Sequence, residues 1–171
     1  MNKILYTLLA LIFFIPISAK AQKEASATTK NIFPRAKQEH AVPNTWTEIL
    51  GKRNKIIGYI AYSKPASNGI EGYAGETPLM IVFDENHRII AVKMLRNNET
   101  PSFVNRVTQA GLLNSWNGLN ISEAQQKKVD AVSGATYTST GVINSLHACL
   151  KNLNKNLNKK YLNSASAVFI N

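Results

Sequence analysis

The residues best suited to chemistry lie in one run of ten, 130–139. The run is Asp130-Ala131-Val132-Ser133-Gly134-Ala135-Thr136-Tyr137-Thr138-Ser139. Ser and Thr occupy four of its last seven positions, and the Gly-Ala pair leaves the backbone uncovered. Because a helical pattern follows, we expect this run to enter a helix N-terminus, where free N–H groups and the helix macrodipole favour a phosphate. A Thr hydroxyl in that position can accept a phosphoryl group.

The same composition also suits an ordinary helix cap. Ser and Thr side chains at a helix start accept hydrogen bonds from backbone N–H groups, and caps of this kind are common. Composition and position alone therefore leave two interpretations open, a phosphate site and a cap with spare hydroxyls.

The order of these residues resembles the flavin-attachment motif D-x-x-S-G-A-T-x-T-S of the FMN-binding domain family. This family includes the C subunit of the sodium-pumping NADH:quinone oxidoreductase and the G subunit of the Rnf electron-transport complex. The resemblance implies FMN linked through its phosphate to Thr136 by an FAD:protein FMN transferase, which uses FAD and Mg²⁺ outside the cytoplasm. The residues that it implies at the cofactor are Asp130, Ser133, Gly134, Ala135, Thr136 and Thr138.

A second block is similar to the same family. Its G-Y-x-G … P … E-T-P order is matched by Gly72-Tyr73-Ala74-Gly75, by Pro78 and by Glu99-Thr100-Pro101. The resemblance implies that Gly75, Glu99 and Thr100 lie near the flavin. A helix cap at Thr100 with Glu99 as a surface acid remains the alternative. The family usually has glycine after E-T-P, where this chain has Ser102.

Two tyrosines border these blocks. Tyr73 and Tyr137 are candidates to stack on the isoalloxazine ring, and packing within the protein is an equally compatible role.

Hydrophobic patterns predict the elements that position these residues. We expect strands at Ile56–Tyr62, Leu79–Phe83 and Arg88–Leu95, with a hairpin turn between the last two. We expect helices at Trp46–Leu50, from Pro101 to about Gly111, and from Ser139 to Leu153. The predicted fold class is α+β, a small antiparallel sheet with packed helices.

The N-terminus has the order of a secretory signal peptide. Lys3 precedes an apolar run, Ile4–Ile17, and Ala19-Lys20-Ala21 has the form of a cleavage site. The run of 14 residues is short for a bilayer crossing, which takes about 20. We expect an extracytoplasmic protein, periplasmic or secreted, with an uncleaved membrane anchor as the alternative.

The expected organisation has four parts. They are a signal peptide at 1–21, a flexible tether at 22–44, a single FMN-binding domain at 45–155 and a C-terminal tail at 156–171.

The chain is basic, with a formal net charge of +10 over 171 residues. Cleavage removes Lys3 and Lys20 and no acidic residue, which leaves +8. Aromatic residues make up 8% and do not alternate with basic runs, so we do not expect nucleic acid as a partner. The single cysteine, Cys149, makes no intramolecular disulfide, and no metal or haem motif occurs.

These observations predict an electron carrier rather than a self-sufficient enzyme. No nicotinamide site and no nucleophile–base pair is evident. A covalently held FMN is retained outside the membrane, where it can accept electrons from one membrane or exported redox protein and donate them to another. Two alternatives stay open, a non-covalent FMN-binding protein and a secreted interaction domain that uses its positive charge.

Overall fold

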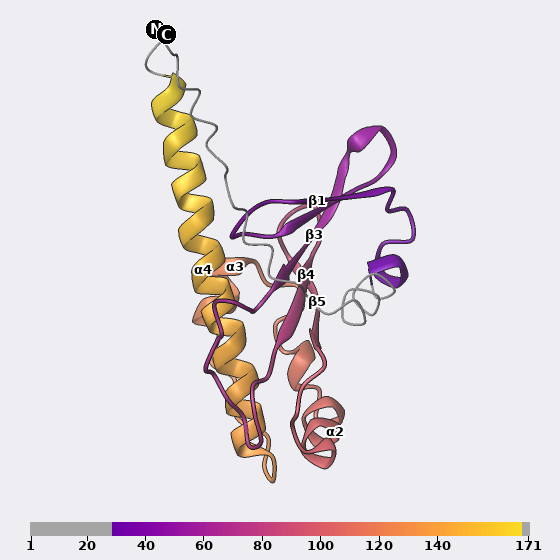
Figure 1. The fold of residues 1–171 in the computed structure, drawn as a ribbon, viewed down its shortest axis with the longest axis vertical. Helices are drawn as coiled ribbons and strands as arrows, with labels where there is room; N and C mark the ends of the chain where they lie inside the picture. Colours follow the sequence, from indigo (N-terminus) through magenta and orange to yellow (C-terminus); the bar gives the residue numbers. More distant parts are fainter. Residues whose placement is uncertain (1–28, 169–171) are drawn as a thin grey trace, which may run out of the picture.

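Five antiparallel strands form one sheet in the order of the sequence, β1-β2-β3-β4-β5. The structure, a computed structural model, describes residues 29–168, with side chains described to residue 158. The strands are β1 (Gln38–Ala41), β2 (Thr47–Leu50), β3 (Ile56–Tyr62), β4 (Leu79–Phe83) and β5 (Ile89–Met94). The helices are α2 (Pro101–Gln109), α3 (Ile121–Gln126) and α4 (Thr136–Val168), with short 3-10 turns η1 (Lys52–Asn54) and η2 (Leu112–Asn114). This architecture confirms the predicted α+β class (Figure 1).

Strand β4 lies between β3 and β5 and is buried along its whole length. Leu79, Ile81 and Phe83 belong to the main core, which includes the packed helices. Met80 and Val82 belong to a smaller cluster, because successive side chains of a strand point to opposite faces. The predicted hairpin is confirmed, since β4 pairs with β5.

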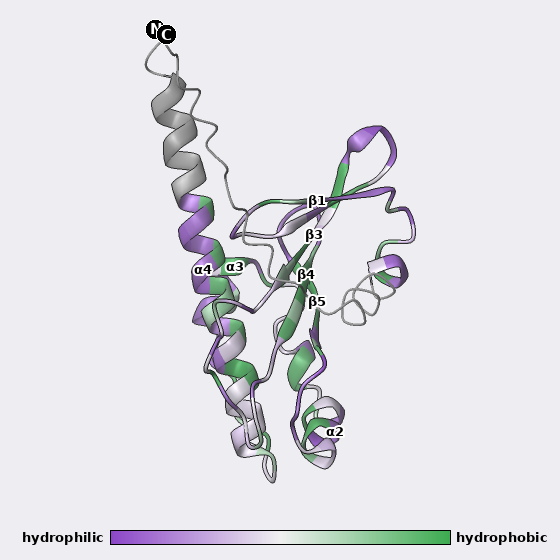
Figure 2. Ribbon diagram, in the orientation of Figure 1, coloured by the Kyte–Doolittle hydropathy of each residue, from purple (hydrophilic) through white to green (hydrophobic). Residues whose placement is uncertain are grey.

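Helix α4 runs along one face of the sheet (Figure 1). Its buried residues Val142, Leu146, Leu150 and Leu153 recur at the three- and four-residue spacing of one helix face. Figure 2 shows hydrophobic residues along the central strands and a mixture of hydrophobic and hydrophilic residues along α4. The main core lies between these two surfaces and includes the fully buried Trp116.

The prediction of a helix at Trp46–Leu50 was wrong, because this stretch contains strand β2. The strand pairs with β1 on one side and with β3 on the other. Ile49 is fully buried while its neighbours in the strand are half-buried. Five residues are too few to separate a period of 2 from a period of 3.6, and pairing on both edges satisfies the backbone as a strand.

Part of the segment 22–44, which was expected to be a flexible tether, forms a strand in the structure. Residues 38–41 form β1, which pairs with β2 in register from Gln38 opposite Leu50 to Ala41 opposite Thr47. The preceding turn brings Phe33 to within van der Waals contact of β3, where it is 8% exposed. The sheet therefore begins before the expected domain boundary, because one aromatic side chain and a paired strand hold this polar segment on the domain.

The helix expected to end at Leu153 continues through Val168, so most of the expected tail at 156–171 is helical. No glycine or proline follows Gly141 in this helix. The Asn156 amide donates to the Asn152 side chain at 2.5 Å, one helical turn earlier. Leu157 packs against the main core. These contacts extend the helix beyond the apolar pattern that predicted it.

The expected signal peptide at 1–21 lies outside the described residues. Within the part of the chain that the structure describes, no helix combines the length and apolar composition needed to cross a membrane.

We predict that Phe33→Ala lowers the free energy of unfolding by about 3 kcal/mol, the low end for removing a buried aromatic ring. Chemical denaturation measures the change, with Arg35→Ala as the control because Arg35 is an exposed neighbour. Equal stabilities of the two variants would show that the segment before β1 does not contribute to the folded core.

Candidate functional site

Thr136 is the first residue of α4, and its side chain is exposed. The segment before it makes a turn at Ser133 and Gly134 and then buries Ala135. The first N–H groups of a helix have no intrahelical acceptor. The structure confirms that the motif enters a helix N-terminus, three residues earlier than the expected start at Ser139.

Ser139 holds the turn that precedes Thr136. Its hydroxyl donates to the Ala135 carbonyl at 2.7 Å and accepts from the Val132 N–H at 3.0 Å. Gly134 takes a positive φ of 75° in this turn, a conformation that glycine adopts without strain. The Ser139 hydroxyl is buried and used within the protein, so it stabilises the loop.

Glu99 is a buried carboxylate, only 5% exposed, that joins two parts of the site. One of its oxygens accepts from the N–H groups of Ala74 and Gly75 at 2.9 and 3.1 Å. The other accepts from the Thr138 hydroxyl at 2.5 Å. The structure therefore brings Glu99, Gly75 and Thr138 together, and it corrects the alternative that Glu99 is a surface acid.

The hydrogen bonds to Glu99 also set its charge state. Burial by itself raises the pKa of this carboxyl, because it disfavours the charged form. The hydrogen bonds that the carboxylate accepts lower the pKa and prevail, so the pKa lies below its ordinary value. They come, in order of size, from Thr138, Ala74, Tyr73 and Gly75.

Two glycines allow the glycine-rich loop to lie directly on α4. A Cβ on Gly141 would lie 2.9 Å from backbone atoms of Glu71 and Gly72. A Cβ on Gly72 would lie 2.6 Å from a carboxylate oxygen of Glu99. Both distances are shorter than carbon atoms tolerate, so the absence of side chains at these positions permits the contact between Glu99 and the loop.

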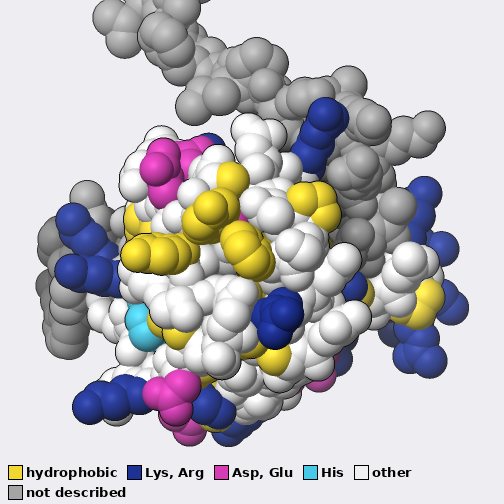
Figure 3. All heavy atoms as spheres, turned by 90° about the horizontal axis from the view of Figure 1, so that it is seen from below, with side chains coloured by type: hydrophobic (Ala, Val, Ile, Leu, Met, Phe, Trp, Pro, Cys, Tyr) yellow, Lys and Arg dark blue, Asp and Glu magenta, His cyan; other side chains and the backbone are white. Residues whose placement is uncertain are grey.

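An aromatic surface adjoins Thr136. Tyr73 is 61% exposed and Tyr137 is 72% exposed. The Tyr73 ring meets Phe103 edge to face at 5.0 Å and lies 6.5 Å from Tyr137. These rings and residues 134–138 line a cavity of about 200 Å³. Figure 3 shows hydrophobic side chains gathered on this end of the molecule.

The other predicted residues contribute less directly. Asp130 and Ser133 are exposed, and no hydrogen bond or ion pair joins either side chain to the rest of the described chain. Thr100 is the N-cap of α2, as predicted, but its hydroxyl makes no capping hydrogen bond. Its carbonyl accepts from the N–H groups of Phe103 and Val104 instead.

Two residues of α2 were not predicted at the site. Phe103 lines the cavity, and the guanidinium of Arg106 lies against Gly134. They are three positions apart and share one helix face. This spacing was visible in the sequence, but which face meets the 130–139 run depends on tertiary packing.

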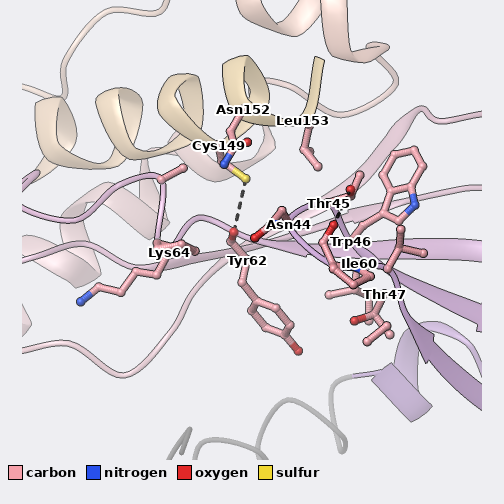
Figure 4. A pocket seen from close by; sticks show the side chains of 15 residues that line it. Asn44, Thr45, Trp46, Thr47, Ile60, Tyr62, Lys64, Cys149, Asn152 and Leu153 are labelled. Atoms are coloured by element: carbon pink, nitrogen blue, oxygen red, sulfur yellow. Dashed lines mark hydrogen bonds between the residues drawn. The ribbon is translucent and has the colours of Figure 1, made fainter. Parts of the chain in front are cut away.

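A larger cavity, of about 290 Å³, lies elsewhere, between α4 and the β1–β2 connection (Figure 4). Burial raises the pKa of the Cys149 thiol beside it to about 12, so this cysteine is an unreactive core residue. The Cys149 thiol donates a hydrogen bond to the Tyr62 carbonyl, with 3.5 Å between sulfur and oxygen. The Lys64 ammonium at the rim is paired with Glu76. The predicted site residues do not line this cavity.

Comparison with known proteins shows what the chain is similar to. Residues 72–151 match the family model described as FMN-binding domain. The match begins in the glycine-rich loop, ends within α4, and includes Glu99 and Thr136. The chain is also 24% identical to the G subunit of an ion-translocating oxidoreductase complex from Shewanella piezotolerans, over 90% of this chain and 82% of that protein.

We predict that Glu99→Gln lowers the free energy of unfolding at pH 7 by about 1 kcal/mol, because hydrogen bonds to a charged group exceed neutral ones by about that amount. A folded-state pKa below the ordinary value of 4.5 stabilises the fold above about pH 4.5. This stabilisation is lost as the pH falls through the folded pKa. The difference between wild type and variant should therefore shrink below about pH 4.5.

Denaturation at a series of pH values measures this effect. Glu71→Gln is the matched control, because Glu71 is exposed and should change stability little. Parallel pH profiles for wild type and Glu99→Gln would contradict the assignment.

Proposed function

We propose that this chain, which contains a domain of the FMN-binding family and is distantly homologous to a component of an oxidoreductase complex, is an exported electron carrier. In this proposal FMN is held as a phosphoester on Thr136. The observation that carries it is the position of the Thr136 hydroxyl, exposed at the first residue of α4 and beside the aromatic cavity.

The residues present fit the two chemical parts of FMN. A phosphate suits the first turn of α4, whose N–H groups lack intrahelical acceptors. A flat, largely apolar ring system suits Tyr73, Phe103 and Tyr137, since aromatic rings associate by stacking and edge-to-face contacts. The cavity that they line is continuous with Thr136.

Exposure distinguishes the four Ser and Thr hydroxyls of the motif. Thr138 and Ser139 are fully buried and bonded within the protein. Ser133 and Thr136 are exposed, but only Thr136 lies within the helix. A modifying enzyme can reach Thr136 without unfolding the site.

The proposed modification is a phosphoryl transfer from FAD. The Thr136 hydroxyl oxygen forms a bond to the phosphorus of the FMN half while the pyrophosphate bond breaks. AMP leaves, and the hydroxyl proton passes to a base of the FAD:protein FMN transferase or to solvent. The two negatively charged halves of FAD require Mg²⁺ for this step.

The bound flavin supplies the electron chemistry, and the protein supplies attachment and orientation. The homologue's name places it in an ion-translocating oxidoreductase complex. By analogy we propose membrane or exported redox proteins as electron donor and acceptor. The apolar run Ile4–Ile17 and Ala19-Lys20-Ala21 support export.

We predict that the chain co-expressed with an FAD:protein FMN transferase gains the mass of one FMN less one water and stays yellow after denaturation. Thr136→Ala should lose both properties, because the acceptor oxygen is gone. Thr140→Ala is the matched control, since Thr140 is exposed on the same helix and should be modified like wild type. Intact-mass spectrometry measures all three.

Each alternative has a distinct outcome in the same experiment. Flavin that is released on denaturation, at equal levels in Thr136→Ala, indicates non-covalent binding. A colourless wild-type chain, with the transferase active on a control substrate, contradicts the flavoprotein proposal and favours an interaction domain.

Export is tested separately by the N-terminus of the protein recovered from the expressing cells. We predict a mature chain that begins at Gln22, in the extracytoplasmic fraction. A full-length chain that fractionates with membranes would indicate an uncleaved anchor, and one in the cytoplasm would contradict export.

A further inference from the structure

We infer that Arg106 is the counter-charge of the phosphodiester on Thr136 and orients the attached cofactor. This inference rests on the proposed flavin attachment. It begins with the contact between α2 and the turn before Thr136. A Cβ on Gly134 would lie 3.1 Å from Nη1 of Arg106, 3.3 Å from Cζ and 3.4 Å from Nε. The flat guanidinium therefore lies over the bare backbone of Gly134.

No carboxylate accounts for this position. The ion pairs within the described residues involve other cations, namely His40, Lys55, Lys64 and Arg88. Arg106 makes no hydrogen bond through its side chain to any described residue and is exposed. A guanidinium that rests on a backbone turn keeps its N–H groups available for an anion, and its planar fork matches two phosphate oxygens.

The distance to the modified residue is short. Consecutive Cα atoms are about 3.8 Å apart, so the Cα atoms of Gly134 and Thr136 lie within about 7.6 Å of each other. A phosphate bonded to the Thr136 hydroxyl is thus within reach of the long, exposed Arg106 side chain. Gly134 contributes by having no side chain between them.

The charges of the site give Arg106 a physical role. A phosphodiester carries one negative charge, and the buried Glu99 carboxylate lies beside Thr138, two residues after the attachment point. Two like charges in a partly dry site oppose each other. Arg106 supplies the nearby positive charge that offsets this repulsion. Phe103, on the same face of α2, lines the ring cavity, so α2 contacts both halves of the cofactor.

A purely structural role for Arg106 makes a different prediction. Arg106 also lies in the last turn of α2, where any cation interacts favourably with the helix dipole. Loss of that interaction changes the stability of α2 but not the environment of a phosphorus atom. The experiment therefore measures the environment of the phosphodiester directly.

The test uses flavinylated wild type, Arg106→Ala and Arg106→Lys, with Lys151→Ala as the control. Lys151 is an exposed cation of α4, about 22 Å along the helix from Thr136. Intact mass reports attachment, and the ³¹P resonance and flavin fluorescence anisotropy report the held cofactor. We expect all four proteins to carry the flavin. Arg106→Ala should lose anisotropy and show a ³¹P shift toward a free diester, with partial rescue in Arg106→Lys and none of these changes in Lys151→Ala.

Several results overturn the inference. Unchanged ³¹P shift and anisotropy in Arg106→Ala would do so, as would the same changes in Lys151→Ala. If Arg106→Ala is not flavinylated but Arg106→Lys is, the result supports a requirement for a positive charge at this position. Failure of both folded variants shows that the transferase needs the arginine itself and refutes the inference. An unmodified wild type, with the transferase active on a control substrate, refutes the proposed function and this inference together.

Discussion

The buried carboxylate of Glu99 is the interaction on which the site depends. It accepts hydrogen bonds from the loop N–H groups of Ala74 and Gly75 and from the Thr138 hydroxyl, so it connects segments that are 24 to 39 residues apart in the chain. The loop can approach because Gly72 and Gly141 have no side chains. This carboxylate gives the first turn of α4 and the loop that carries Tyr73 a common hydrogen-bond acceptor. The exposed surface around Thr136 is therefore supported by the buried carboxylate of Glu99.

The site divides its polar groups into those that hold the fold and those that face outward. Thr138, Ser139 and Glu99 are buried and form hydrogen bonds within the protein. Thr136, Tyr137 and Arg106 are exposed. A site on a rigid helix start keeps its outward groups in place through such internal bonds. Two hydroxyls of the motif, those of Thr138 and Ser139, therefore stabilise the fold around the exposed Thr136.

The sequence predicted the parts of this arrangement that have a local signal. The order of residues 130–139 located a helix N-terminus, and the apolar alternation around the Asp84–His87 turn located the β4–β5 hairpin. The resemblance placed Glu99 near the site, but its burial was not predicted, because its polar neighbours Asn98 and Thr100 resemble a surface segment and its partners are distant in sequence. Likewise, the contact of Arg106 with Gly134 exists only once α2 is packed. Strand β2 was missed because its length carries too little periodicity.

The exposed tyrosines leave an apolar surface open to water beside Thr136. Monomeric soluble proteins rarely leave large contiguous apolar surface open to water, since such patches promote association. Tyr73 and Tyr137 are each more than half exposed beside an open cavity. This part of the surface is therefore prone to association with other apolar groups. In the proposed carrier, a flavin attached at Thr136 would cover these rings, so attachment would lower the tendency to associate as well as supply a redox group.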